Sequence, residues 1–484
     1  MKCQYWNGLG GFTAVLLVLS GCAAVGPDYR EPEMRTPDAW SAQITGQIEL
    51  EQNASLQTWW KIFNDPVLND LIERARQANL DLKIAVARIS AARFVLAGAR
   101  GGKQPTIVGS GNASIEHPSD SESQPGADNN IESYQLGLGA TWEMDVFGRV
   151  RRSIEAAGAS YQASVEDYRD VMVSLYADVA LAYIDIRSTQ QRISDTRVNA
   201  ASMARSLDMA EALYQSGVAS RLDVVQASAN LETTQAAIPL LQIGLERSIN
   251  RMAVLLGQDA GSLQNEFVEL RPLPVGNTLV GIGVPAAVLR QRPDIRRAER
   301  LLAAQSAEVG IATAALYPSF SLAGFFGLQS NSLSNLFNGS ALAWGLQTPV
   351  QWNLFNGGVV RSNVSYQDAI LQQRLLEYRK QVLAAIEEVE NALAAFNFNQ
   401  VRSEHLVSAT TAIREAVDLV LVQYNTGLTD FNNVLITQRD LVSQQDQLDL
   451  TRANIDVALV ALYKALGGGW NPDEAIPLDS DPGT

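Results

Sequence analysis

The sequence predicts a mainly α-helical protein with a smaller β part, built from two copies of one unit. Three observations support this prediction. The stretch YQSGVASRLDVV at 214–225 recurs as YNTGLTDFNNVL at 424–435, an offset of 210 residues (424 − 214). Long proline-poor segments have apolar residues three or four positions apart, the spacing of helices. Shorter segments alternate apolar and polar residues, the period of strands.

The repeat sets the predicted organisation of the chain, because residues around both copies keep nearly the same offset. Trp142 pairs with Trp352, and Gly217 pairs with Gly427. The expected segments are a signal peptide at 1–21, an extended arm at 22–66, a first repeat at 67–257 with strands in 105–142 and a tip at 214–223, a linker at 258–284, a second repeat at 285–467 with strands in 318–355 and a tip at 424–433, and a tail at 468–484.

The first residues predict export and lipid attachment. Lys2 precedes a short apolar core at 12–19, which is too short to span a bilayer. The motif LSGC then ends at Cys22 and fits the site after which bacterial lipoproteins are cut, leaving a lipid on the sulfur of Cys22. Ala23, in place of Asp, resembles the signal that sorts such proteins to the outer membrane. An ordinary signal peptide with an incidental cysteine is the alternative.

Composition and motifs disfavour several classes of function. The net charge of −15 disfavours nucleic acid and anionic lipid as partners. Cys3 would leave with the signal peptide, so the mature chain would have no disulfide. His117 and His405 lie far apart without companions at metal-ligand spacing. With no GxSxG motif and no phosphate loop, we expect no enzyme, no metal and no cofactor other than the lipid on Cys22.

The longest predicted helix covers 152–214, a stretch without proline, and the second repeat has its counterpart. From Leu371 to Phe396 apolar residues follow one another by four and three positions in alternation, the 3.5 spacing of a coiled-coil seam. A helix of about 65 residues would be roughly 100 Å long. Helices of about half that length are expected at 68–98, 222–256, 294–315 and 433–466.

Two pairs of strands are predicted, one in each repeat, with polar loops at 118–130 and 330–339. Strands of about ten residues with aromatic residues near their ends fit a membrane β-barrel. A pair of strands in a soluble sandwich is the alternative.

Four strands cannot close a barrel, and an open sheet edge is not tolerated in lipid. Several chains must therefore share one barrel, with eight strands from two chains or twelve from three. Eight strands leave an interior just filled by side chains, whereas twelve leave room for a pore. The small residues Ser110, Gly137 and Gly139 would suit the inside of such a pore. The sequence therefore predicts a trimeric outer-membrane barrel of twelve strands, four from each chain, continued by long helices.

These features resemble the TolC-type outer-membrane channels of bacterial tripartite efflux systems, in their lipoprotein branch. The residues that support the resemblance span nearly all of the mature chain: LSGC (19–22), GPDY (26–29), WW (59–60), FNDP (63–66), NLDL (79–82), WEMDVFGR (142–149), RPDI (292–295), YP (317–318), WNLF (352–355), GG (357–358) and YKALG (463–467). The resemblance implies a homotrimer whose helices form a tunnel across the periplasm. It also implies passive export of small molecules such as drugs, delivered by a proton-driven inner-membrane pump of the RND type, with a periplasmic adaptor protein at the hairpin tips.

The resemblance places the function at the two tips. Asp223 falls where such channels often have an acidic gate residue, and three copies around a threefold axis would form a ring that attracts cations. Alternatively, Asp223 caps the returning helix, where an acid is favourable. Tyr424 matches a gate tyrosine whose hydroxyl joins neighbouring helices, with simple packing as the alternative.

The second tip departs from the family pattern. Thr429, Asn433 and Ile436 stand where some members have charged gate residues, and Asp430 could compensate for them. An ion-pair latch and an apolar constriction from Val434 or Leu435 are therefore alternatives. The candidate gate residues are Asp223, Tyr424, Asp430 and Asn433, and the candidate adaptor contacts are Gly217, Val218, Gly427 and Leu428.

Two other functions compete with export of small molecules. One is the outer-membrane conduit of a protein secretion system, which shares the fold. The other is a non-conducting coiled coil on the cell surface. Strand pairs in both repeats disfavour the coiled coil, because a stalk needs only one anchor, and the LSGC and GPDY motifs favour small-molecule efflux.

Overall fold

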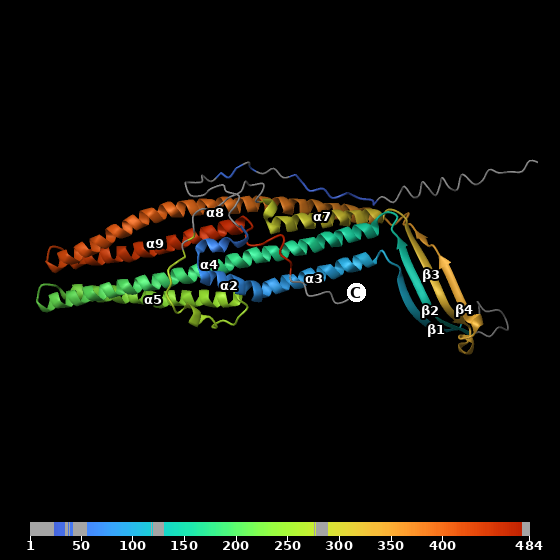
Figure 1. Cartoon of the computed structure of the whole chain (residues 1–484), viewed down its shortest axis with the longest axis horizontal. Coiled ribbons are helices and arrows are strands. Elements are labelled where there is room, and N and C mark those ends of the chain that lie inside the picture. The colour runs from blue at the N-terminus through green and yellow to red at the C-terminus, as the bar shows by residue number, and fades with distance from the viewer. Residues whose placement is uncertain are drawn as a thin grey trace, which may run out of the picture. The chain divides into compact units, whose positions relative to one another are not determined.

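The computed structural model describes residues 24–33, 37, 39–41, 56–117, 119, 130–274, 276 and 289–476. They form helices and one sheet, which Figure 1 labels in chain order. The chain divides into two compact units: one lies within Met1–Glu33, Ile89–Ser164 and Arg297–Tyr378, and the other within Met34–Arg88, Val165–Arg296 and Arg379–Thr484. The sheet belongs to the first unit and both helix turns belong to the second.

The helices repeat with the offset that the sequence predicts. Helix α4 (Arg149–Gln215) and helix α8 (Val359–Asn425) have 67 residues each and begin 210 residues apart (359 − 149). The returning helices α5 (Arg221–Leu255) and α9 (Phe431–Ala465) have 35 residues each and also begin 210 residues apart (431 − 221). In the second unit, α4 runs beside α5 and α8 beside α9 (Figure 1). None of the helices in the described part of the chain combines the length and the apolar character that crossing a bilayer requires.

The helix predicted at 68–98 is in fact two helices, α2 (Pro66–Ala78) and α3 (Leu80–Gly101). They are separated by Asn79, which has an extended ψ of 133°. Its side-chain oxygen accepts hydrogen bonds from the backbone N–H groups of Asp81 and Leu82, and its amide donates to the carbonyl of Leu255. Asparagine is a favoured N-cap because its oxygen satisfies amides that have no partner inside the helix. The second repeat has a similar break: residues 289–291 are helical, Arg292 is not, and α7 (Pro293–Ala314) begins directly after it.

The prediction of an extended arm at 22–66 is wrong for its last part. Residues Leu56–Phe63 form a 3₁₀ helix, η1, with Trp59 and Phe63 buried. Trp59 stacks on Tyr463 of α9, with ring centroids 5.4 Å apart. This stacking removes the ring of Trp59 from water, which stabilises the coiled conformation of the segment. Cys22, the predicted lipidation site, lies outside the described residues.

In the first unit, residues 24–33 pack on α4 and α7. The guanidinium of Arg152, in α4, donates to the carboxylate of Asp28 at 2.7 Å, and the Tyr29 hydroxyl donates to Glu299 of α7. Gly26 has a φ of 89°, and a Cβ there would lie 2.5 Å from the backbone of Gly310. Glycine is therefore required on both counts.

The sheet is antiparallel with the strand order β1-β2-β3-β4. The strands are β1 (Thr106–Glu116), β2 (Ile131–Met144), β3 (Ser319–Ser330), β4 (Leu342–Gln347) and the short β5 (Val350–Gln351), which also pairs with β3. Each repeat supplies a hairpin, and the hairpins join through β2 and β3, where Leu136 is opposite Leu328. The second of the two strands predicted within 318–355 is interrupted at Pro349, which has no N–H to donate to a ladder.

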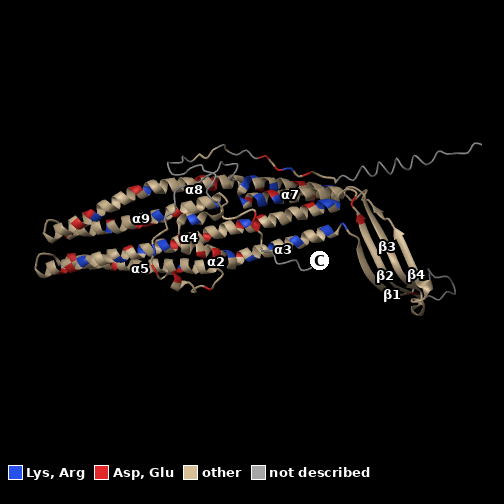
Figure 2. Ribbon diagram, viewed as in Figure 1, with Lys and Arg blue, Asp and Glu red and all other residues tan. Residues whose placement is uncertain are grey.

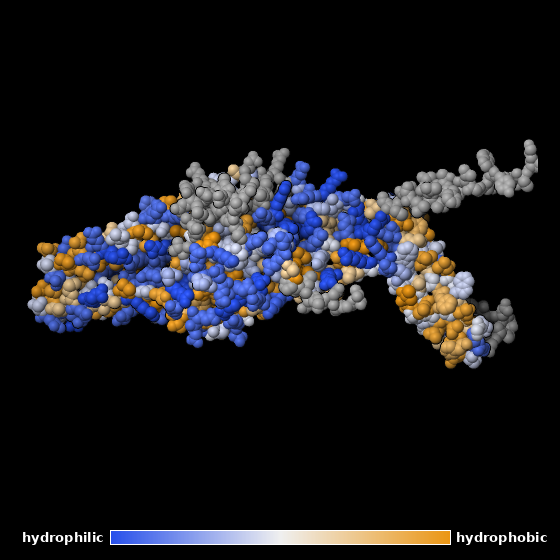
Figure 3. All heavy atoms as spheres, in the orientation of Figure 1, coloured by the Kyte–Doolittle hydropathy of each residue, from blue (hydrophilic) through white to orange (hydrophobic). Residues whose placement is uncertain are grey.

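The two faces of the sheet differ in character. Directly opposite residues share a face, so Gly109, Leu138, Phe326 and Trp344 form one row, and the next row lies on the other face. Leu138, Phe326 and Trp344 are 55%, 59% and 76% exposed. The charged residues within the strands, Glu116, Glu132 and Glu143, lie at strand ends, so the strands are almost entirely tan in Figure 2. In Figure 3 hydrophobic surface gathers over the strands.

The other face of the sheet has small and polar residues. Ser110 is opposite Gly137, and Gly139 lies two positions further along β2, so the three residues predicted to line a pore share this face. The ring of Phe325 lies over the face, and a Cβ at Gly137 would come within 2.7 Å of that ring. Glycine at position 137 therefore makes room for the ring of Phe325. Among the described strands, the rows of Gly137 and Gly139 together contain one aromatic residue, Phe325.

Candidate functional site

The two helix turns have the same backbone geometry. Gly217 and Gly427 have φ angles of 75° and 76°, in the left-handed region that glycine adopts without strain. The N–H of Val218 donates to the carbonyl of Leu213, and the N–H of Leu428 donates to that of Gln423. These bonds across a left-handed glycine define a Schellman motif, which ends a helix by satisfying its last carbonyls.

The predicted adaptor contacts lie on the surface of these turns. Val218 is 70% exposed and Leu428 is 80% exposed. A Cβ built on Gly217 or Gly427 would have no neighbour within 4 Å among the described residues. The turns therefore present one exposed apolar side chain each beside open space.

The structure joins the two turns through two predicted gate residues. The hydroxyl of Tyr424, at the end of α8, donates to the carboxylate of Asp223, at the start of α5, at 3.1 Å. Burial, and then the hydrogen bond to Asp223, raises the pKa of Tyr424 above its ordinary value, so the hydroxyl keeps its proton. The bond therefore connects the second repeat to the first.

Asp223 also lies in the first turn of its own helix, beside the N-cap residue Ser220. The Ser220 hydroxyl accepts from the backbone N–H of Asp223 at 3.3 Å and donates to the Asp223 carboxylate at 2.6 Å. A carboxylate in the first turn is also stabilised by the helix dipole. One carboxylate oxygen thus serves the cap and the other accepts from Tyr424.

Asp430 and Asn433, the remaining candidate gate residues, form the equivalent cap of α9. Asp430 is the N-cap, and its carboxylate accepts from the backbone N–H of Asn433 at 3.1 Å. The amide of Asn433 donates to the Thr429 hydroxyl at 2.8 Å. Both side chains bond within their own turn, whereas Asp223 reaches the other repeat.

Val434 and Leu435, the alternative apolar constriction, are buried inside the protomer at 0% and 3% exposure. They belong to an apolar cluster supplied by all four long helices, whose other members are Ala210, Ala227, Val420, Tyr424 and Phe431. The rings of Tyr424 and Phe431 lie 5.0 Å apart in it. Neither Val434 nor Leu435 can line a passage unless this cluster opens.

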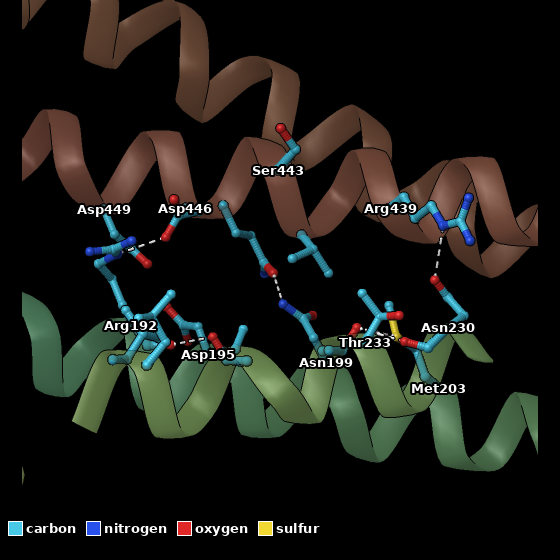
Figure 4. A pocket seen from close by; sticks show the side chains of 17 residues that line it. Arg192, Asp195, Asn199, Met203, Asn230, Thr233, Arg439, Ser443, Asp446 and Asp449 are labelled. Atoms are coloured by element: carbon cyan, nitrogen blue, oxygen red, sulfur yellow. Dashed lines mark hydrogen bonds and ion pairs between the residues drawn. The ribbon is translucent and has the colours of Figure 1, made fainter. Parts of the chain in front are cut away.

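A line of polar contacts that none of the sequence patterns above predicted joins α9 to α4 and α5, and we call it the polar seam. Figure 4 shows part of it, with Arg439 directed to Asn230 and Arg192 directed to Asp446. The bonds of the polar seam are Arg192 to Asp446 at 2.7 Å, Asn199 to Gln445 at 2.7 Å, Arg439 to Asn230 at 3.0 Å and Gln438 to Ser206 at 2.7 Å. The sequence did contain a signal for the polar seam, because amide side chains at the contact positions of paired helices are known to fix the register of coiled coils.

Long paired helices in two copies, matching turns, and a sheet with an exposed apolar face are features of a protein whose sheet contacts lipid and whose helices extend away from it. The sequence profile named "Outer membrane efflux protein" matches residues 71–258 and 284–468, one match to each repeat. The chain belongs to this family. It is therefore an efflux protein of the outer membrane and not an enzyme.

Individual relatives agree with the family. The toluene efflux pump outer membrane protein TtgF of Pseudomonas putida is 32% identical over 491 residues, which cover 99% of each chain. Nodulation protein T of Rhizobium leguminosarum bv. trifolii is 30% identical over 456 residues, 94% of this chain and 96% of the relative.

Solved structures with the same fold include two outer-membrane channels. The channel OprN is 36% identical, with a TM-score of 0.85 over 92% of this chain and 99% of that chain. The open state of the MtrE channel of Neisseria gonorrhoeae is 28% identical, with a TM-score of 0.79 over 92% of this chain and 98% of that chain.

Proposed function

We propose that three copies of this chain form the outer-membrane channel of a tripartite efflux system. Their sheets join into one barrel of twelve strands, with β4 and β5 counted as one. The long helices continue it into the periplasm, and the lipid on Cys22 provides an additional anchor. Small molecules, which the names of the relatives suggest include solvents and antibiotics, are delivered by an RND-type inner-membrane pump with a periplasmic adaptor protein.

The observation that best supports this proposal is the sheet, which has one apolar face, one face of small and polar residues, and an unpaired strand at each edge. Among the described strands, β1 pairs only with β2, and β4 pairs only with β3. An unpaired edge has unsatisfied N–H and C=O groups, which hydrocarbon does not tolerate. A second copy of the same sheet, added edge to edge, satisfies these groups, and repetition of this contact closes a ring. The apolar face then contacts lipid, and the face with Ser110, Gly137 and Gly139 lines the pore.

In this proposal the helix turns form the periplasmic gate. The bond from Tyr424 to Asp223 holds the turns of one chain together and so favours the closed state. Three Asp223 side chains around the axis give the entrance a preference for cations. Asp430 and Asn433 shape the second turn, while Val218 and Leu428, beside Gly217 and Gly427, contact the adaptor.

Two neighbouring substitutions on β2 test the membrane-spanning ring. Leu138→Arg places a charge on the apolar face, where a charged residue at the bilayer midplane costs about 2–4 kcal/mol. Gly139→Arg places the same charge on the opposite face, where Cβ has no neighbour closer than 3.9 Å. We expect purified wild type to be trimeric and to conduct ions in planar bilayers, Leu138→Arg to lose insertion, and Gly139→Arg to insert with a reduced preference for cations.

Equal insertion of both variants would contradict the assignment of the faces. A wild-type protein that is monomeric and soluble without detergent would contradict the shared barrel. A trimer that inserts without conducting would instead favour a structural role over export.

A further inference from the structure

A pocket of about 430 Å³ lies along the polar seam in the second unit, between α4 and α5 on one side and α9 on the other (Figure 4). Pockets that hold small organic molecules have volumes of about 300–1,000 Å³. This pocket is therefore large enough for a ligand, and it is separate in sequence from the residues of the two turns.

One side chain in the pocket lacks a hydrogen-bond donor. Asp449 of α9 is only 8% exposed, and its Oδ2 has no hydrogen-bond partner among the residues that the structure describes. Asp195 of α4 lies against it, and Asp195 already accepts from the amide of Gln191 at 3.0 Å. Burial, and then the contact with Asp195, raises the pKa of Asp449 to about 7. When Asp449 is protonated it can share that proton with Asp195, and when it is charged its Oδ2 has no donor among the described residues.

The nearby cationic groups do not donate to this oxygen. Arg192 of α4 donates to Asp446 at 2.7 Å, and Arg439 of α9 donates to Asn230 of α5 at 3.0 Å. Arg452 of α9 acts on Asp449 only through its charge, which opposes the rise in pKa. The residues that α5 contributes to the lining have amide, hydroxyl and aliphatic side chains.

The lining also has an apolar part. It includes Met203 of α4, Leu240 and Leu241 of α5, and Val442 of α9. An inorganic cation would leave these side chains without a partner, whereas a hydrocarbon group would contact them. The pocket therefore combines an acidic end with a missing donor and an apolar wall.

We propose that this pocket binds a small organic ammonium cation. Its N–H donates to Oδ2 of Asp449, and its hydrocarbon part lies against Leu240 and Leu241 of α5. A charge-assisted hydrogen bond of this kind is about twice as strong as one between neutral groups. The proposal goes beyond the export function, because it assigns a ligand site among α4, α5 and α9, apart from the residues of the two turns.

The ammonium ion and the proton compete for the same carboxylate. Above pH 7 Asp449 is mostly charged and available to the ligand, and below pH 7 it is mostly protonated. We therefore expect the affinity to fall about tenfold from pH 8.5 to pH 6.

The test is isothermal titration calorimetry of the full chain in detergent with 2-phenylethylammonium and, as a neutral molecule of the same size, 2-phenylethanol. At pH 8.5 we expect the ammonium ion to bind and the alcohol to bind roughly tenfold to a hundredfold more weakly. The variant Asp449→Asn should lose affinity for the ammonium ion by a similar factor. The control is Asp440→Asn, which removes the same charge from an exposed position of α9 and should bind like wild type.

Three results would each overturn the proposal: equal binding of the alcohol, unchanged affinity in Asp449→Asn, or no binding of the ammonium ion at pH 8.5. Asp449→Asn keeps the size of the side chain, and an unchanged melting temperature would show that the variant is folded. If the melting temperature of Asp449→Asn falls, the wild type provides a second test. An affinity of wild type for the ammonium ion that rises from pH 8.5 to pH 6 would overturn the proposal.

Discussion

Tyr424→Phe removes the hydroxyl that joins the two helix turns and leaves the ring in place. The hydroxyl donates to Asp223 at 3.1 Å, and the ring packs 5.0 Å from that of Phe431. Because Tyr424 is 6% exposed and its cluster is apolar, phenylalanine fits the site without a cavity. The substitution therefore changes the bond between the repeats and little else.

The size of the effect follows from the surroundings of Asp223. A hydrogen bond to a charged group contributes about 1.5–3 kcal/mol, but Asp223 is only half-buried, and water can replace part of the lost bond. We therefore expect a loss of about 1 kcal/mol for each chain, because the bond contributes less where water competes. This corresponds to roughly a fivefold shift toward the open turn.

Single-channel recording in planar bilayers measures this shift as the open probability. The control is Tyr214→Phe at the equivalent position of the first repeat, where the tyrosine is 44% exposed. Asp223→Asn separates the bond from the charge: it retains an acceptor for Tyr424, so its open probability should stay near that of wild type while its preference for cations falls. An open probability of Tyr424→Phe equal to that of Tyr214→Phe would refute the role of this bond.

Three further predictions concern stability and processing. Gly427→Val forces a β-branched residue to a φ of 76° and should lower the free energy of unfolding by at least about 1–2 kcal/mol, measured as a lower melting temperature. The control Gly339→Val is at a glycine with φ below zero and open space around it, and it should have a smaller effect. Burial raises the pKa of Asp456 to about 7, so the folded state keeps this proton between pH 4 and pH 7 while the unfolded state releases it. Asp456 therefore destabilises the fold increasingly from pH 4 to pH 7. Asp456→Asn should raise the melting temperature at pH 8 but not at pH 4. Cys22→Ala should abolish the mass increment of the lipid in mass spectrometry of the exported protein, and an unchanged mass increment would place the lipid elsewhere.

The repeat and the helices could be predicted from the sequence because they depend on local signals. The proline-free stretch 152–214 predicted α4 to within three residues, the apolar spacing from Leu371 to Phe396 predicted a helix there in the second repeat, and the glycines at 217 and 427 predicted the turns between helices. The boundaries were wrong where one side chain decides between local alternatives. At Asn79 a side-chain cap starts a new helix although the apolar pattern is continuous, and at Pro349 a missing N–H interrupts a strand.

The sequence by itself determined the family, the duplicated helices and the alternation of the strands, because these are patterns among residues close in the chain. The tertiary structure alone decided which distant side chains meet. Asp223 and Tyr424 are 201 residues apart in the chain, and Arg192 and Asp446 are 254 apart, yet each pair forms a bond. The same holds for Asp449, whose unpaired oxygen results from its burial between two repeats. No local pattern records such contacts, because packing of whole helices brings them together.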